Sequence, residues 1–289
     1  MTETTSEQRR PRAIIDSIPW ARLPWWGFIL IISGLVIAYL ILADSNYNAT
    51  FLFLVEGAIT TVRITFFSYI LALILGLITG IARTSKNPII YTISTLYVEI
   101  VRGIPMIVLI LYVAFGIVPL LVTFTNWIGS LGLGIGSGTA LEPFFFGLTQ
   151  YSIRNISMEL RGILALGFGY GAYEAEIFRA GIQAIGKGQI EAARSLGMTY
   201  FQSLRFIVLP QAVRAVLPPL GNDFISLLKD SALLTVLAVS ELTQLGRQRR
   251  ASTFRVFETF NVVVFLYLML TLVLSGGVRY LERKMKIED

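Results

Sequence analysis

Long apolar runs recur along this chain of 289 residues and constrain its fold more than any other feature. A helix needs roughly 20 predominantly apolar residues to cross the hydrocarbon core of a bilayer. Charged residues make up 15% of the chain, whereas a soluble domain carries about 25%. The sequence therefore predicts an all-α integral membrane protein and excludes a soluble enzyme. Six transmembrane helices are predicted, at Trp25–Ala43, Gly57–Ala82, Ile89–Val122, Gly162–Ile185, Leu220–Leu245 and Phe257–Val278.

Two of these runs need separate interpretation. The third is too long for one straight span, and Gly103 and Pro105 fall inside it. Proline removes a backbone donor and kinks a helix, so we expect an oblique segment followed by the true span. The first run could instead be a signal peptide. We favour an uncleaved anchor, because acidic residues precede it and no small-residue cleavage site follows it.

The distribution of Lys and Arg predicts the orientation, because cytoplasmic loops are enriched in these residues. One side carries 14 of them: Arg9, Arg10, Arg12, Arg22, Arg83, Lys86, Lys187, Arg194, Arg205, Arg214, Arg279, Arg283, Lys284 and Lys286. The other side carries six: Arg154, Arg161, Arg247, Arg249, Arg250 and Arg255. We therefore predict that both termini are cytoplasmic. The basic run from Arg247 to Arg255 is the one local contradiction of this rule.

Two loops between the predicted spans are long. The outer segment Thr123–Arg161 combines a glycine-rich run at 129–138 with Pro143 and three phenylalanines at 144–146. Exposed aromatic rings are unfavourable in water, so this segment is predicted to be a lid or a packed re-entrant loop that contacts lipid or protein. The inner segment Gly186–Pro219 is the long cytoplasmic loop.

The chain contains neither cysteine nor histidine. This excludes a Cys/His zinc site, a cysteine nucleophile and a Ser-His-Asp triad. We predict no catalytic residues and no metal site, because no loop rich in Asp and Glu suggests carboxylate ligands for Mg²⁺ or Ca²⁺. The net charge of +6 does not indicate nucleic acid binding, because the basic residues flank apolar runs.

A match to the start of a phosphate-binding loop, Gly181-x4-Gly186-Lys187, is rejected. Position 188 is glycine, where that motif requires a Ser or Thr hydroxyl to hold Mg²⁺. The run also ends an apolar span instead of following a β-strand. A glycine-rich exit from a helix explains it, and no ATP hydrolysis is expected in this chain.

The cytoplasmic loop carries the strongest local signal. Residues Gln189–Leu196 are predicted to form a helix that Gly197 stops, and a second short helix is predicted from Tyr200 to Val208, ending near Pro210. Two short helices at an angle form a knob suited to a groove in another protein. The alternative is an amphipathic loop on the lipid surface. Both interpretations agree with a narrow apolar stripe in this segment outside the membrane, formed by Ala192, Leu196 and Tyr200.

The same loop resembles a known signature. It contains Glu191-Ala192-Ala193, three residues, Gly197, nine residues, and Ile207-Val208-Leu209-Pro210. This pattern is similar to the signature loop of the permease subunits of binding-protein-dependent ABC importers. Further segments resemble the polar amino-acid permeases of that family: Tyr97–Pro105, Gly171–Gly181, Gly186–Asn222, Ser226–Leu233 and Glu241–Thr243. The chain departs from the compact five-span core by its first span and its outer insertion, and Gly186 stands where the family often has proline.

The resemblance implies a permease domain over residues 57–283, with an outer insertion at about 123–161 and a coupling loop at about 186–219. Residues 1–24 and 284–289 would be cytoplasmic tails, and residues 25–56 an additional helix with its outer loop. By this resemblance the loop docks into an ATPase subunit through Glu191, Ala192, Ala193, Gly197, Ile207, Leu209 and Pro210. A side chain would strain the turn at Gly197. The substitution Gly197→Asp is therefore expected to abolish coupled transport without affecting membrane insertion.

The implied assembly is an ATP-driven importer of polar amino acids in the bacterial cytoplasmic membrane. It comprises a second permease subunit, two ATPase subunits that bind ATP and Mg²⁺, and an external solute-binding protein; this chain would hold no cofactor. One alternative is a secondary transporter driven by an ion gradient, with its intramembrane carboxylates as coupling sites. A membrane scaffold without transport is a weaker alternative, because a scaffold has no need of charges inside its spans.

Charged side chains interrupt three of the apolar runs. Such a charge costs roughly 2.5–3.5 kcal/mol near the bilayer centre and usually faces a cavity or a partner. Glu99 and Arg102, and likewise Glu176 and Arg179, are three residues apart and can pair within one helix. Structural ion pairs explain these charged residues as well as a substrate-binding site does. If a zwitterion passes here, Arg102 suits its carboxylate and Glu176 or Asp230 its ammonium group. The candidate pathway residues are Glu99, Arg102, Glu174, Glu176, Lys229 and Asp230.

Overall fold

The computed structural model describes residues 25–136 and 138–285, so the predicted tail at 1–24 and all but the first two residues of the predicted tail at 284–289 lie outside the described residues. In this described part the chain forms helices and no strands, which confirms the all-α prediction. The α-helices are α1 Trp25–Ala43, α2 Ser45–Ala82, α3 Pro88–Gly103, α4 Met106–Tyr112, α5 Val118–Gly136, α6 Glu142–Thr149, α7 Met158–Gln183, α8 Lys187–Ser195, α9 Tyr200–Ser203, α10 Leu209–Asp230, α11 Leu242–Thr253 and α12 Val256–Met285. Two π-helical turns, Val113–Ile117 and Leu204–Val208, and two 3₁₀ segments, Ile153–Asn155 and Ser231–Leu237, connect them.

Helices α2 and α7 pack closely because glycines of each lie against the other. A Cβ on Gly80 of α2 would stand 2.8 Å from the Cβ of Phe178, and a Cβ on Gly76 would overlap Glu174. In return, a Cβ on Gly171 of α7 would stand 2.9 Å from Leu75 Cβ. Helices in lipid gain little from burying apolar surface against each other, so small residues that let the backbones approach supply the packing.

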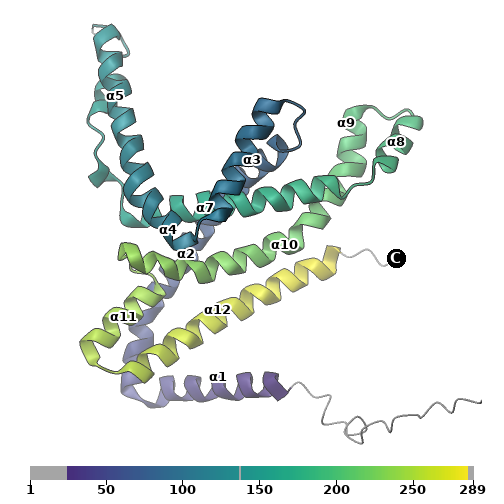
Figure 1. The fold of residues 1–289 in the computed structure, drawn as a ribbon. Helices are drawn as coiled ribbons and strands as arrows, with labels where there is room; N and C mark the ends of the chain where they lie inside the picture. The colour runs from purple at the N-terminus through teal and green to yellow at the C-terminus, as the bar shows by residue number, and fades with distance from the viewer. Residues whose placement is uncertain (1–24, 137, 286–289) are drawn as a thin grey trace, which may run out of the picture.

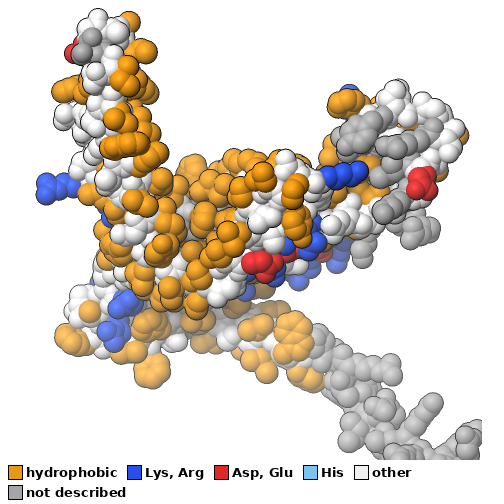
Figure 2. Space-filling model, turned by 45° about the horizontal axis from the view of Figure 1, so that its top comes forward, with side chains coloured by type: hydrophobic (Ala, Val, Ile, Leu, Met, Phe, Trp, Pro, Cys, Tyr) orange, Lys and Arg blue, Asp and Glu red, His pale blue; other side chains and the backbone are white. Residues whose placement is uncertain are grey.

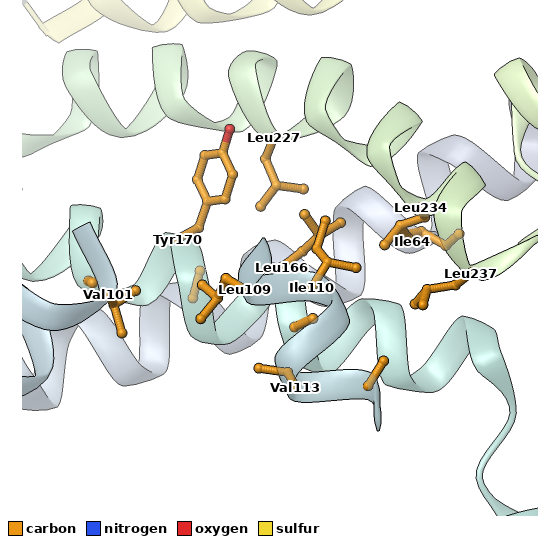
Figure 3. Close-up of a cluster of buried hydrophobic side chains, with 14 of the residues drawn as sticks. Ile64, Val101, Leu109, Ile110, Val113, Leu166, Tyr170, Leu227, Leu234 and Leu237 are labelled. Carbon is orange, nitrogen blue, oxygen red and sulfur yellow. The ribbon is translucent and has the colours of Figure 1, made fainter. Parts of the chain in front are cut away.

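The buried apolar side chains form two clusters. The larger joins α2, α3, α4, α7 and α10 (Figure 3), and its members include Ile64, Leu109, Ile110, Leu166, Leu227 and Leu234. The smaller cluster joins α1, α2, α11 and α12 through Ile41, Leu54, Leu242, Leu245 and Val262. Outside these clusters many large apolar side chains are exposed, and they are widespread on the face shown in Figure 2. Such a surface is unfavourable in water and suits lipid.

Four helices of the described chain are long and apolar enough to cross a membrane: Trp25–Ala43, Ser45–Ala82, Met106–Ile135 and Val256–Lys284. The count of six spans is therefore not confirmed. Helix α7 has 26 residues and α10 has 22, which is long enough to span. Both carry several charged residues, and α10 contains Pro218 and Pro219 inside the helix.

The predicted fifth span, Leu220–Leu245, is wrong as a continuous helix. Helix α10 ends at Asp230, a 3₁₀ segment follows, and Ala238 adopts a left-handed conformation with φ of 55°. The buried carboxylate of Glu241 then caps α11 by accepting from the N–H groups of Thr243 at 2.9 Å and Gln244 at 2.7 Å. Hydropathy does not detect such a cap, because apolar residues surround it on both sides.

The third predicted span is interrupted where the sequence places Gly103 and Pro105. Helix α3 ends at Gly103, Ile104 is extended, and α4 begins directly after Pro105. A π-helical turn then joins α4 to α5. The oblique segment before a second, longer span is thus α3.

The predicted lid or re-entrant loop at Thr123–Arg161 is instead largely helical. Helix α5 continues through the glycine-rich run to Gly136, and α6 folds back beside it as a hairpin. A Cβ on Gly132 would overlap the ring of Phe145, and a Cβ on Gly129 would stand 2.9 Å from Leu148 Cβ. Gly129 and Gly132 thus form the surface that receives α6, while Gly138, with φ of +81°, lies in the turn between the two helices.

The elements divide between two ends of the molecule (Figure 1). Helices α8 and α9 project at one end, and α1 begins and α12 ends towards that same side. Helix α11 and the base of the α5–α6 hairpin lie at the opposite end. Helix α10, with 22 residues, leads from one end to the other and is about 33 Å long.

Candidate functional site

Helices α8 and α9, the turn between them and the π-helical turn Leu204–Val208 project from the molecule and are here called the knob (Figure 1). Gly197 makes the turn, with φ of +78° and nothing within 4 Å of an added Cβ. This backbone conformation favours glycine. The N–H of Met198 donates to the carbonyl of Ala193 at 3.1 Å, closing α8. The sequence therefore predicted the helix and its stop correctly.

The second helix of the knob does not end near Pro210 as expected. Helix α9 runs through the π-helical turn Leu204–Val208 directly into α10, and Pro210 lies in the first turn of α10. A proline lacks the N–H that a preceding turn would use. Because the π turn already shifts the hydrogen bonding at this point, the helix continues past the proline. The knob is thus joined to α10 by an unbroken helical connection.

The signature residues occupy different positions on the knob. Ala193 is 1% exposed and lies on α8, which packs against α9 and the π-helical turn that follows it. Glu191, Ala192 and Pro210 are exposed, as is Leu209, while Ile207 is half-buried. The outer surface of the knob also presents large apolar side chains, with Leu196 83% exposed, Phe201 78% and Phe206 63%. Exposed apolar side chains of this kind mark a contact with another protein or with lipid.

A second group of functional candidates gathers around one carboxylate on α7. Glu176 contacts three guanidinium groups: Arg83 at 2.5 Å, Arg179 at 2.6 Å and Arg102 at 3.3 Å. Arg83 also reaches Glu99 at 3.5 Å. The Glu176–Arg179 pair forms as the spacing predicts. The structure pairs Glu99 and Arg102 with these other residues instead of with each other, because three chain segments converge here.

Arg102 and Glu176 border a cavity of about 480 Å³ between α7 and α10. Half of its lining residues are alanine or glycine: Ala180, Gly181, Ala184 and Ala215. Arg102 is 43% exposed, and its guanidinium also lies 5.6 Å from the ring centroid of Tyr173. The cavity therefore presents an arginine with free surface beside a carboxylate that is already engaged.

The other predicted pathway residues do not border this cavity. Glu174 is completely buried against α2, and neither carboxylate oxygen has a hydrogen-bond partner within the described chain. Asp230 accepts a hydrogen bond from Tyr170 Oη at 2.8 Å, and Lys229 precedes it at the end of α10. Glu99 is 65% exposed beyond Arg83.

Arg83 is the member of the group that sequence reasoning missed. It follows the second apolar run, and the sequence reasoning used it only in the count of Lys and Arg that predicts orientation. In the structure its side chain is 7% exposed and forms an ion pair with Glu176. Its position after a span was visible in the sequence. Its partner, 93 residues away, was not.

Apolar helices, a projecting knob and a charged cavity behind it are the features expected of a membrane transport protein. Residues 72–287 match the family described as "Binding-protein-dependent transport system inner membrane component". The match covers well over half of the chain, so the protein belongs to this family. It is an amino-acid ABC transporter permease subunit of the inner membrane and not itself an enzyme.

Curated relatives and solved structures agree with this assignment. The chain is 34% identical over 234 residues to the glutamine transport system permease protein GlnP of Escherichia coli (strain K12), covering 81% of this chain and 93% of that one. It is 32% identical to the histidine/lysine/arginine/ornithine transport system permease protein HisQ of the same organism, with the same coverage. A crystal structure of an amino acid ABC transporter with histidines matches with a TM-score of 0.65 and 32% identity, over 84% of this chain and 98% of that chain.

Proposed function

We propose that this subunit translocates polar amino acids and is driven by a separate ATPase that docks on the knob. The observation that carries the proposal is the connection between the knob and the cavity. Helix α7 leads into α8, and α9 continues into α10. The same two helices, α7 and α10, wall the cavity beside Arg102 and Glu176. A displacement of the knob would therefore be transmitted directly to the cavity walls.

The cavity chemistry supports a zwitterionic substrate. The planar guanidinium of Arg102 matches a carboxylate, and its exposure leaves it accessible. Glu176 already contacts three arginines, so we propose that it binds the substrate's ammonium group only after one of these ion pairs opens. Asp230 stays the alternative acceptor, although Tyr170 binds it in this structure. The printed names of the relatives, for glutamine and for histidine, lysine, arginine and ornithine, favour a polar amino acid.

The proposed assembly contains a second permease subunit, two ATPase subunits that bind ATP and Mg²⁺, and an external solute-binding protein. We place the knob and both chain termini on the cytoplasmic side, in accord with the Lys and Arg distribution. The common direction of the start of α1, the end of α12 and the knob supports this placement (Figure 1). A secondary transporter driven by an ion gradient would need no such knob.

A pull-down in mild detergent from native membranes tests the coupling role. We expect an ATPase subunit to co-purify with the wild-type chain and to be lost from Gly197→Asp, whose side chain would face the docking surface from a glycine turn. Gly186→Asp is the matched control. Gly186 has open space around it and stands directly before α8, where an aspartate can cap the helix. Equal recovery of the ATPase with both variants would refute the role of the turn.

The substrate role of Arg102 is tested in the reconstituted complex. We expect Arg102→Ala to weaken the stimulation of ATPase activity by substrate while assembly is unchanged. Arg102→Lys should retain part of the stimulation, because a lysine keeps the charge but not the planar fork. If Arg102→Ala instead prevents assembly, Arg102 is a structural ion-pair partner of Glu176.

A further inference from the structure

Helix α11 presents two arginine side chains that have neither an ion pair nor a hydrogen bond within the described chain. Arg249 donates to Thr50 Oγ1 at 3.3 Å, and Arg255 pairs with Glu258 at 3.6 Å. Arg247 and Arg250 are exposed, and the described residues offer them no ion pair or hydrogen bond. They are three residues apart and so lie on one face of the helix. The opposite face of α11 is buried in the smaller apolar cluster, which turns the arginines outward.

Two phenyl rings lie directly beyond these arginines. Phe254 ends α11 in a left-handed conformation with φ of 57° and is 87% exposed. Phe257, in the first turn of α12, is 80% exposed. Val264 is 60% exposed and lies seven residues further, on the same face of α12. An apolar strip therefore runs from the arginines along the helix.

This surface lies at the level where three candidate membrane spans begin or end, which is where the edge of the hydrocarbon layer is expected. Helix α1 ends at Ala43, α2 begins at Ser45 and α12 begins at Val256, and each is a candidate membrane span. The guanidinium of Arg249 lies 5.8 Å from the ring of Phe53 near the start of α2, which ties α11 to this level. Figure 2 shows Lys and Arg side chains at this end of the molecule.

We propose that Arg247, Arg250, Phe254 and Phe257 form a binding site for an anionic phospholipid at the membrane face opposite the knob. The two guanidinium groups bind the phosphate of the headgroup, as arginine does through its planar donors. The phenyl rings and the strip along α12 contact the acyl chains. An acidic protein surface would also attract the arginines, but it would not contact the apolar strip along α12, which lies in the bilayer. The proposal explains a basic run on the side where the positive-inside rule disfavours one.

Because the chain has no cysteine, a single Ala251→Cys can carry a fluorophore beside Arg250. The labelled full-length protein is placed in nanodiscs of phosphatidylcholine that contain a small fraction of lipid with brominated tails, either phosphatidylglycerol or phosphatidylcholine. We expect brominated phosphatidylglycerol to quench the fluorophore as strongly as if its local fraction around the label were on the order of tenfold above its average fraction in the nanodisc. The enrichment should fall with rising salt and disappear in Arg247→Gln/Arg250→Gln.

Two control variants make the result specific. Arg154→Gln removes an exposed arginine away from α11 and should leave the enrichment unchanged. Arg247→Lys/Arg250→Lys retains the positive charges and should preserve most of the lipid enrichment. That result would also show that the helix tolerates substitution at both positions. Equal quenching by the two brominated lipids, or enrichment that survives the double glutamine variant, overturns the proposal. Shielding of the label by an added solute-binding protein, without lipid enrichment, would identify an acidic protein as the occupant instead. Nanodiscs expose both leaflets, so the outcome is independent of orientation and of ATPase docking.

Discussion

At the scale of single residues, the group around Glu176 shows how charges are accommodated inside this protein. One carboxylate is shared by guanidinium groups that follow α2, end α3 and lie on α7. Arg83 is almost fully buried, so its charge depends on this partner. A buried charge left without its partner is strongly destabilising. By contrast, the Arg83–Glu99 contact is long, and Glu99 is mostly exposed.

Substitutions at Glu176 and Glu99 are therefore expected to differ sharply in their effect on the free energy of unfolding. Glu176→Gln should lower the free energy of unfolding by about 3 kcal/mol, because it strands the buried Arg83. Glu99→Gln should cost less than about 1 kcal/mol, as exposed ion pairs do. Thermal or denaturant unfolding of both variants in the same detergent gives the comparison. Similar losses for the two variants would contradict the assignment of Glu176 as the centre of the group.

At the scale of elements, glycine determines the closest helix contacts. Gly76 and Gly80 of α2 and Gly167 and Gly171 of α7 each lie against the partner helix. The same use of glycine holds the α5–α6 hairpin together. The hydropathy pattern registers these glycines as neutral positions or as breaks, although their role is to let two backbones approach.

A pair of alanine substitutions separates packing from helix propensity. Gly76→Ala should destabilise by about 1–3 kcal/mol, because its Cβ would overlap Glu174 and the backbone of Ala175. Gly34→Ala is the control, since an added Cβ in α1 meets nothing within 4 Å. Alanine is the better helix former, so this variant should be neutral or slightly stabilised. Unfolding midpoints in detergent test the pair, and equal midpoints would argue against overlap at Gly76.

At the scale of the whole molecule, two ends with different chemistry are separated by the length of α10. One end carries the knob with its exposed Leu196 and Phe206, and the other carries α11 with its arginines. The proposed coupling requires such a polarity, because the ATPase and the solute-binding protein would act on opposite sides.

Single cysteines test this arrangement in cells. A membrane-impermeant maleimide should label Ala251→Cys from outside and should label Leu196→Cys only after the membrane is permeabilised. Both positions are exposed in the structure, and the cysteine-free chain supplies the unlabelled background. Labelling of both cysteines from one side would contradict a membrane placement with these ends opposed. Labelling in the reverse order would keep the polarity but overturn the proposed orientation.

The sequence by itself determined those features that depend on neighbours along the chain. The apolar runs predicted membrane helices, Gly197 predicted the turn of the knob, and Gly103 with Pro105 predicted the break before α4. Each follows from local hydrophobicity or backbone conformation. Tertiary structure alone decided the rest: the contact of Tyr267 Oη with the buried Glu241, the use of glycines as packing surfaces, and the partners of Arg102 and Glu99. These depend on which distant segments meet in space, and the free energy of a buried charge or a close helix contact is set by that meeting.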